Sequence, residues 1–278
     1  MTPLLFVLVV FLVALVAGFA GSLLGIGGGL IVIPALPLLL HIDIRLAIGA
    51  SIISVIATSS GAAAAYVREH LANLRVAMFL EIGTTIGAIT GAYLAGRIHP
   101  RWLYLLFGAM LGYSAAAMLR RMHSEGRPAP DDRLSRFLRL SGTYYDEAVG
   151  QQIDYPVHRP LLGLGLMYVA GAVSGLLGIG SGALKVPAMD LGMGLPMKVS
   201  SATSNLMIGV TAAASAGLYF ARGQIDPFIA APVALGVLGG ALIGSRLLAR
   251  LHAERLRYAF VVVLLIISVQ MFVKGVLG

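Results

Sequence analysis

The sequence contains no cysteine and few charged residues. The missing cysteines exclude disulfides, thiolate metal sites and cysteine nucleophiles. Charged residues make up 12% of the 278-residue chain, about half the share that soluble domains carry. The catalytic signatures His-Glu-x-x-His and Gly-x-Ser-x-Gly are absent, and none of the six histidines has metal-ligand spacing. We therefore expect no enzyme, no cofactor and no bound metal.

Long apolar segments dominate what is present. Hydrophobic residues make up 58% of the chain, and the mean hydropathy is +0.91. The segments cover residues 3–24, 29–41, 44–67, 76–96, 101–119, 160–178, 182–194, 198–221, 227–249 and 257–276. Most are long enough, at 1.5 Å per residue, to cross a hydrocarbon core of about 30 Å. This pattern predicts an all-α polytopic membrane protein. The net charge of +8 then reflects topology and contact with lipid headgroups, and we expect no nucleic-acid partner.

Two stretches of the chain are copies of each other. Gly18–Leu36 reads GFAGSLLGIGGGLIVIPAL, and Gly171–Met189 reads GAVSGLLGIGSGALKVPAM. The offset of 153 residues holds without a gap for roughly eighty residues, so that Thr58 aligns with Thr211. In a membrane protein, a duplicated apolar segment with a glycine-rich interruption is typical of a transporter site.

The segments 29–41 and 182–194 are too short to cross a membrane as straight helices. Each is either the returning limb of a re-entrant hairpin or one half of a broken helix. Each half then has three or five crossings, and either odd number gives the two halves opposite orientations. The distribution of Lys and Arg favours the same arrangement, with the N-terminus outside. We expect two inverted repeats, residues 1–119 and 160–278, each with a glycine-rich broken or re-entrant helix near its start. A cytoplasmic linker, residues 120–159, joins them.

The linker is the one extended polar part of the chain. Its segment DDRLSRFLRL places Leu134, Phe137 and Leu138 on one helical face. This pattern indicates either an interfacial amphipathic helix or a solvated linker helix. The following segment, SGTYYDEAVGQQIDYPVHRP, predicts a short hairpin with Gly150 near its turn.

The glycine runs Gly25–Gly29 and Gly178–Gly182 are not nucleotide-binding loops. Neither completes G-x-G-x-x-G, because the sixth position is Leu30 in one and Ala183 in the other. An interruption of an apolar helix instead leaves backbone N–H groups unpaired where the helix restarts, and these groups favour an anion. Close packing of small residues is the alternative. We predict a substrate site that includes Gly27, Gly28, Gly29, Gly180, Ser181 and Gly182.

Two polar features distinguish the second copy from the first. Lys185 stands where the first copy has Val32, and an ammonium inside a membrane needs water or an anion. The alternative is a lysine that extends to the membrane surface. The hydroxyl and amide groups between Ser200 and Asn205 suit an oxyanion, with helix capping or interhelical hydrogen bonding as the alternative. We predict that the anion is bound by Ser51, Lys185, Thr203, Ser204 and Asn205.

Glycines also recur every four residues at two equivalent places. These glycine ladders are Gly83, Gly87 and Gly91 in the first half and Gly236, Gly240 and Gly244 in the second. They predict close helix contacts, either between the repeats or between the protomers of a homodimer. Glu81 lies next to the first ladder and aligns with Ala234. We interpret it as a solvated residue near a helix end, with a proton relay as the alternative.

The duplicated residues resemble the sulfite exporter TauE/SafE family of membrane permeases. The resemblance lies in AGSLLGIGGGLIVIPAL, SGLLGIGSGALKVPAM and SSATSN, and the segment SGTYYDEAVGQQIDYPV is similar to the linker of one branch of the family. The sequence departs from the family at Ser181, where glycine is usual, and at Ile48 to Ser51, where Gly-Thr-Ser is more common. The resemblance implies secondary transport, commonly outward, of sulfur-containing anions such as sulfite or organosulfonates. It also implies a multi-pass protein of the bacterial or archaeal inner membrane.

The sequence therefore supports one main hypothesis and two rivals. The main hypothesis is a secondary transporter whose partners are a small anion and the lipid bilayer, with alternating access around the two glycine runs. The first rival is a membrane scaffold, which would have a dry, packed interior at the glycine runs. The second rival is a transporter of a cation or neutral solute, which would line its cavity with carbonyls and carboxylates.

Overall fold

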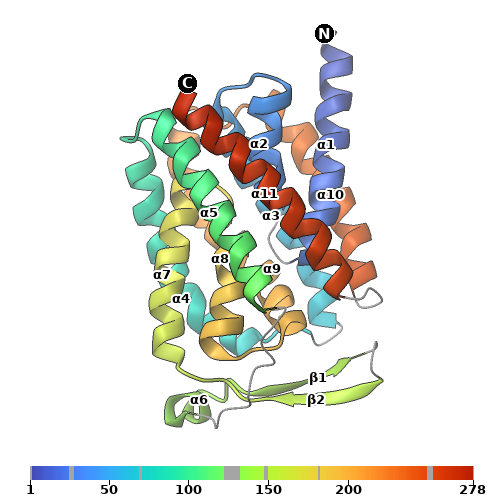
Figure 1. The fold of residues 1–278 in the computed structure, drawn as a ribbon, viewed down its shortest axis with the longest axis vertical. Helices are drawn as coiled ribbons and strands as arrows, with labels where there is room; N and C mark the ends of the chain where they lie inside the picture. Colours follow the sequence, from blue (N-terminus) through green and yellow to red (C-terminus); the bar gives the residue numbers. More distant parts are fainter. Residues whose placement is uncertain are drawn as a thin grey trace.

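Helices form nearly all of the structure, a computed structural model that describes residues 2–24, 28–68, 71–121, 132–146, 150–180, 182–248 and 253–277. The first half contains α1 (Pro3–Leu24), α2 (Gly29–Leu39), α3 (Ile44–Arg68), α4 (Leu74–Ala95) and α5 (Pro100–Arg121). The linker contains α6 (Arg133–Phe137), β1 (Gly142–Asp146) and β2 (Gln151–Tyr155). The second half contains α7 (Pro160–Leu177), α8 (Gly182–Pro187), the π-helix η1 (Ala188–Gly192), α9 (Met197–Ala221), α10 (Pro227–Leu248) and α11 (Ala253–Leu277). Figure 1 shows these elements as one helical bundle with the β1–β2 hairpin at one end.

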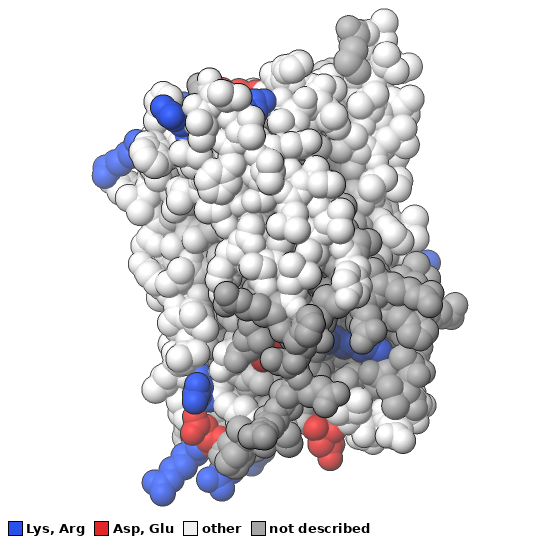
Figure 2. Space-filling view, in the orientation of Figure 1, with Lys and Arg blue, Asp and Glu red and all other residues white. Residues whose placement is uncertain are grey.

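Six helices in the described part of the chain are long and apolar enough to cross a membrane. They cover residues 3–23, 44–61, 74–95, 160–177, 197–221 and 227–246. Figure 2 shows the charged side chains of one face gathered mainly towards its two ends, with a broad uncharged area between them. Large apolar side chains such as Met78, Ile82 and Leu235 are more than half exposed, as expected of a surface that faces lipid. The prediction of an all-α polytopic membrane protein is confirmed.

The most extensive contacts between helices join the two halves of the chain. α1 packs along α10, and α4 packs along α7. The glycine ladders lie in these two contacts. A Cβ atom at Gly83, Gly87 or Gly91 would meet the backbone of Leu164, Tyr168 or Ala172 on α7. A Cβ atom at Gly236, Gly240 or Gly244 would meet the backbone of Phe11, Leu15 or Phe19 on α1, or the side chain of Ser22. The ladders therefore allow backbone-to-backbone approach between the halves of one chain.

In each half, the short helical segment that follows the first long helix ends near the start of that helix. The backbone N–H of His158, just before α7, donates to the carbonyl of Met193, just after η1, at 2.9 Å. In the first half, Phe6 near the start of α1 and Leu40 just after α2 belong to the same apolar cluster. In Figure 1, α1 starts at the end that carries both chain termini, whereas α7 starts at the end that carries the linker. The first helices of the two halves, α1 and α7, thus start at opposite ends of the bundle.

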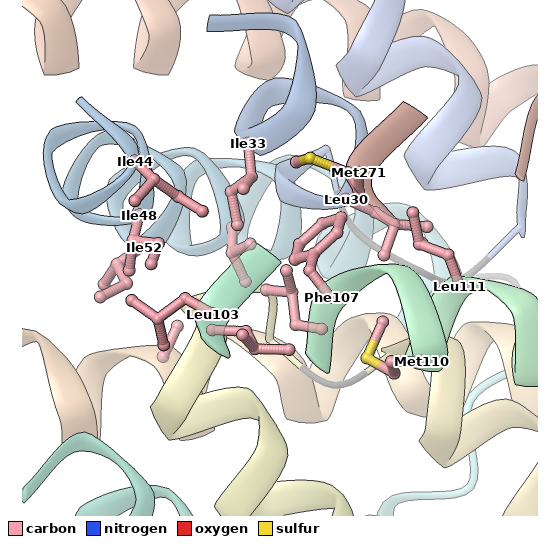
Figure 3. Packing of buried hydrophobic residues seen from close by; sticks show 14 of the residues in the cluster. Leu30, Ile33, Ile44, Ile48, Ile52, Leu103, Phe107, Met110, Leu111 and Met271 are labelled. Carbon is pink, nitrogen blue, oxygen red and sulfur yellow. The ribbon is translucent and has the colours of Figure 1, made fainter. Parts of the chain in front are cut away.

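The main apolar core surrounds α2. Leu30 and Ile33 of α2 pack with side chains of α3, α5 and α11, among them Ile48, Phe107 and Met271, all of which are buried (Figure 3). The same cluster continues to Leu177 and Ile179, around the end of α7. Elements of both halves therefore share one core.

The linker covers the end of the bundle at which α4 and α9 begin. β1 and β2 form the predicted antiparallel hairpin, with Gly150 in its turn at φ = +69°. The Asn73 side-chain amide donates to the Leu140 carbonyl at 2.7 Å and to the Tyr155 hydroxyl at 3.0 Å. Burial raises the pKa of the Tyr155 phenol above its usual range, and the hydrogen bond from Asn73 offsets part of that rise. The hairpin is thus held to the membrane helices by buried polar contacts.

Candidate functional site

Each glycine run lies at a junction between two helices, one between α1 and α2 and the other between α7 and α8. α1 ends at Leu24 and α2 begins at Gly29, while α7 ends at Leu177 and α8 begins at Gly182. Gly178 and Gly180 have φ angles of +66° and +72°, in the left-handed region that glycine adopts at little cost. The predicted site residues Gly27 and Ser181 lie outside the described residues. Gly182 is buried at the first position of α8.

Both junctions contact the same side chain. A Cβ atom at Gly29 would meet the hydroxyl of Ser51 and, at 2.7 Å, a methyl group of Val55. A Cβ atom at Gly180 would meet the other methyl group of Val55 and, at 3.1 Å, Ile208. Val55 and Ile208 are fully buried on α3 and α9, which pack against each other. Gly29 of one junction and Gly180 of the other therefore both approach Val55, at the place where α3 packs against α9.

Side chains of α3 and α9 hold the backbone of both junctions. Ser51 Oγ on α3 donates to the carbonyl of Gly178 at 2.8 Å. Asn205 Nδ2 on α9 donates to the carbonyl of Ser22, near the end of α1, at 3.1 Å. The N–H of Gly28 donates to Thr58 Oγ1 at 3.3 Å. Each of α3 and α9 thus fixes the junction of the opposite half, and Thr58 also fixes the junction of its own half.

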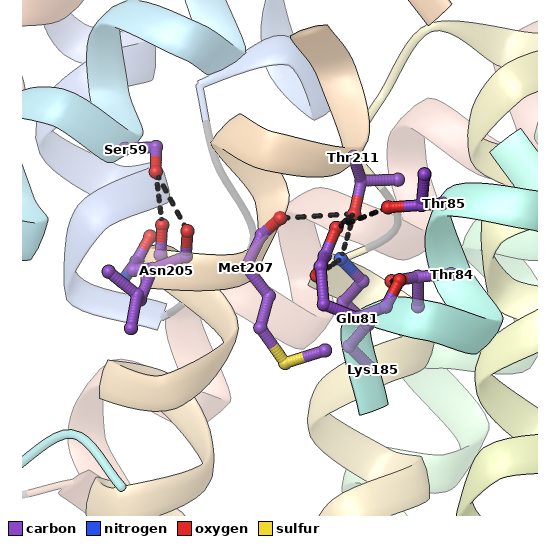
Figure 4. A network of polar contacts seen from close by, with 9 residues as sticks. Ser59, Glu81, Thr84, Thr85, Lys185, Asn205, Met207 and Thr211 are labelled. Carbon is purple, nitrogen blue, oxygen red and sulfur yellow. Dashed lines mark hydrogen bonds and ion pairs between the residues drawn. The ribbon is translucent and has the colours of Figure 1, made fainter. Parts of the chain in front are cut away.

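A buried charge pair lies beside the α7–α8 junction. Lys185 on α8 is fully buried, and its Nζ donates to Thr211 Oγ1 on α9 at 2.6 Å. Thr211 Oγ1 in turn donates to Glu81 Oε1 on α4 at 2.6 Å. Lys185 Nζ lies 3.7 Å from Glu81 Oε2, and the Glu81 side chain is 14% exposed. Figure 4 shows the three groups converging from three different elements.

The charge pair has apolar counterparts in the repeat alignment. Lys185 aligns with Val32 and Glu81 aligns with Ala234, while Thr211 aligns with Thr58. Val32 is fully buried in the cluster that also contains Val233 of α10. The two positions that align with Lys185 and Glu81 thus carry no charge.

The structure brings some of the predicted anion-site residues together and separates others. Ser51, Lys185, Ser204 and Asn205 are fully buried on elements that meet at the junctions. Asn205 Oδ1 is a buried acceptor without a hydrogen-bond partner among the described residues. Thr203 points elsewhere, because its Oγ1 accepts the backbone N–H of Asn73, next to the linker, at 3.0 Å. Its hydroxyl therefore fixes the start of α4 rather than a junction.

Glu81 and Thr211 were missed as site residues by the sequence reasoning. The interpretation of Glu81 as a solvated residue is wrong, since its carboxylate pairs with a fully buried lysine. One signal was available in the sequence. Lys185 and Glu81 are opposite charges within apolar segments, and the repeat alignment gives each an uncharged counterpart. When two opposite charges lie in apolar segments and neither has a charged counterpart in the other repeat, they are expected to form an ion pair with each other.

Two grooves lie outside this site. One, of about 600 Å³, is formed by α2 and α11 and is lined by apolar side chains with Gln270 and Lys274. The other, of about 420 Å³, is formed by α7, α8, η1 and Tyr113 of α5. Neither groove is lined by Ser51, Glu81, Lys185, Asn205 or Thr211. The polar groups at the junctions are thus packed within the bundle in this structure.

The membrane-length helices define a polytopic membrane protein, and polar groups are buried within its helical bundle. The chain belongs to the sulfite exporter TauE/SafE family, whose profile matches residues 10–271. The resemblance seen in the glycine motifs is therefore confirmed.

Relatives across the family carry the same general description. The probable membrane transporter protein YunE of Bacillus subtilis (strain 168) is 28% identical over 279 residues, which covers 98% of each chain. The probable membrane transporter protein YdhB of the same strain is 28% identical over 248 residues, covering 87% of this chain and 89% of YdhB. A probable membrane transporter protein of Xylella fastidiosa (strain 9a5c) is 26% identical over 260 residues, covering 92% and 90% of the two chains. No solved structure shows a significant match. The protein is accordingly a membrane transporter.

Proposed function

We propose that the protein is a secondary transporter, acting as an exporter, of small sulfur-containing anions such as sulfite or short organosulfonates. The observation that carries this proposal is Lys185, a fully buried ammonium next to a glycine-rich junction in a bundle of membrane-length helices. A positive charge at that depth is expensive unless it serves an anion or a pathway. The family to which the chain belongs adds the expectation of sulfur chemistry.

In this proposal, the charge and most of the polar side chains of the anion site come from the second half of the chain. Lys185 supplies the charge, and the buried amide of Asn205 and the hydroxyls of Ser51 and Ser204 supply further polar groups near the junctions. Gly28, Gly29, Gly180 and Gly182 let the backbone approach closely, and Gly27 and Ser181 complete the two glycine runs. The cation-transport rival is weakened because the buried carboxylate that it requires, Glu81, is already neutralised by Lys185.

Transport in this proposal follows from two inverted repeats. Each repeat contributes a re-entrant hairpin, and the hairpins approach the site from opposite membrane faces. The contacts of α1 with α10 and of α4 with α7 support this arrangement, because each joins the first helix of one repeat to the fourth of the other. The positive-inside rule places the linker in the cytoplasm of a bacterial or archaeal cell. Rocking of the repeats about the α3–α9 contact would expose the site to either side.

Transport by the purified protein tests the proposal directly. Liposomes that contain the protein and a high internal concentration of unlabelled methanesulfonate are placed in a trace of the labelled anion. We expect labelled methanesulfonate to accumulate inside by exchange, and unlabelled sulfite to compete with it. Liposomes without protein serve as the control, together with a labelled neutral sugar and labelled sodium as alternative solutes. Exchange of sugar or sodium without exchange of either anion would contradict the proposed substrate class.

A further inference from the structure

The carboxylate of Glu81 lies beside the ammonium of Lys185. One oxygen, Oε1, accepts the hydroxyls of Thr211 at 2.6 Å and of Thr85 at 3.3 Å. The other oxygen, Oε2, lies 3.7 Å from the Lys185 ammonium and has no hydrogen-bond partner among the described residues. We propose that Glu81 is a tethered competitor for the substrate. The substrate anion displaces the carboxylate from Lys185, and Glu81 takes up one proton as it leaves. This inference rests on the proposed function as an anion transporter.

The ammonium of Lys185 has more N–H donors than hydrogen-bond acceptors around it among the described residues. An ammonium has three N–H donors. In the described part of the chain, Lys185 makes one hydrogen bond, to Thr211, and its contact with Glu81 is longer than a hydrogen bond. A buried charge gains most when its partner is close and fully hydrogen-bonded. An oxyanion with three acceptor oxygens can satisfy Lys185 better than the carboxylate does at 3.7 Å.

The displaced carboxylate has a reason to bind a proton. Glu81 is 14% exposed and its nearest ion partner is Lys185, so a carboxylate that loses this lysine would be a poorly solvated, unpaired charge. A proton taken up from solution converts the Glu81 carboxylate to a neutral carboxylic acid. This acid can donate a hydrogen bond to the Thr211 or Thr85 hydroxyl. One anion and one proton therefore bind together, and no other bond is made or broken.

Few other charged groups face Glu81. α7, which packs along α4, contains no Asp, Glu, Lys, Arg or His, and its Tyr168 is 44% exposed. α9 carries one charged side chain, Lys198, in its first turn, and η1 carries Asp190. Neither forms an ion pair with Glu81, whose one ion partner among the described residues is Lys185. The positions that align with Lys185 and Glu81 are Val32 and Ala234, which carry no charge, so we place one coupled site in the transporter rather than two.

Binding measurements on the full-length chain in detergent test this inference. The probe is methanesulfonate, because a sulfonate stays ionised across the pH range used and cannot itself create the pH dependence. Calorimetry in buffers of different protonation enthalpy counts the protons that bind with each anion. For the wild type we expect close to one proton per anion. The apparent Kd should rise by up to about tenfold per pH unit once Glu81 is ionised before binding.

The variant Glu81→Gln removes the competitor and the titrating group while keeping the side-chain size. We expect it to bind methanesulfonate at least about tenfold more tightly than the wild type at mildly acidic pH, with less proton uptake than the wild type. Because its Lys185 has no counter-ion, the variant is purified with methanesulfonate and then exchanged. Glu81→Asp keeps a titrating carboxylate and should keep the proton uptake. Asp226→Asn, which changes a capping carboxylate at the start of α10, is the matched control and should behave as the wild type.

The outcomes separate the two proposals. Binding by the wild type without proton uptake, or equal binding by wild type and Glu81→Gln with the same pH dependence, overturns the coupling while leaving anion transport intact. If neither protein binds methanesulfonate at any pH, the proposed function fails, and the inference fails with it. The wild-type proton count decides the matter even if Glu81→Gln does not fold.

Discussion

Replacing Lys185 with methionine is expected to lower the free energy of unfolding by roughly 3–5 kcal/mol and to abolish anion transport. Methionine matches the length and volume of the lysine stem but carries no charge. The change leaves Glu81 with two threonine hydroxyls and no cation. The nearly buried carboxylate must then either stay ionised without a partner or take up a proton at neutral pH, and either outcome costs free energy that the original pair avoided.

A second substitution separates folding from transport. Adding Glu81→Gln to Lys185→Met removes the unpaired charge, and we expect most of the lost stability to return. Transport should not return, because no cation remains at the junction to bind the anion. The aligned positions of the repeats supply a precedent, since Val32 and Ala234 carry no charge and Val32 is packed in an apolar cluster. Thermal unfolding midpoints in detergent and exchange in liposomes give the two readouts. If the single variant is as stable as the wild type, the charge pair has no structural role.

Gly240→Ala is expected to destabilise the contact between α1 and α10, whereas the neighbouring substitution Gly239→Ala is not. A methyl group at Gly240 would meet the backbone of Leu15 and, at 2.6 Å, the N atom of Phe19. Backbone atoms cannot move aside as a flexible side chain can, so the helices must separate along their length. We expect a loss of about 1–3 kcal/mol, and more if the junction at the end of α1 shifts as well.

Gly239 provides a control within the same helix turn. A methyl group there meets nothing within 4 Å. Alanine favours a helix over glycine by up to about 1 kcal/mol, so Gly239→Ala should be neutral or slightly stabilising. The fraction of monodisperse protein after heating, measured for both variants beside the wild type, checks the prediction. Equal losses would mean that the close approach of α1 and α10 does not depend on Gly240.

The long apolar runs explain why most of the helices could be predicted from the sequence. Apolar runs define the helices, because backbone groups in a membrane must pair within each segment. The predicted bounds of residues 227–249 lie within one residue of α10, Pro227–Leu248. The ladders predicted close contacts but not which helices meet, since a stripe of small residues carries no information about its partner. That choice became visible only when Gly87 was seen against Tyr168 and Gly240 against Leu15.

The candidate site was predicted less completely, for a physical reason. Sequence shows that Lys185 is a charge in an apolar segment, but the identity of its partner depends on which helix crosses α8 in space. Glu81 comes from a helix more than a hundred residues away in sequence, and Thr211 has an ordinary threonine counterpart in Thr58. Thr203 was included because it belongs to the polar run before Asn205, yet helical geometry turns its hydroxyl towards Asn73. Spacing along a helix therefore identified the polar face but not the neighbours of each group.

The position of a bound anion is the measurement that tests the central claim most directly. A crystal of the protein with bromomethanesulfonate would place the bromine by its anomalous scattering. We predict one strong peak beside Lys185, between the α1–α2 and α7–α8 junctions, with the sulfonate near Nζ and the Glu81 carboxylate moved away from it. A peak only in the groove between α2 and α11, or no peak near Lys185 at saturating anion, would contradict an anion site at the glycine junctions.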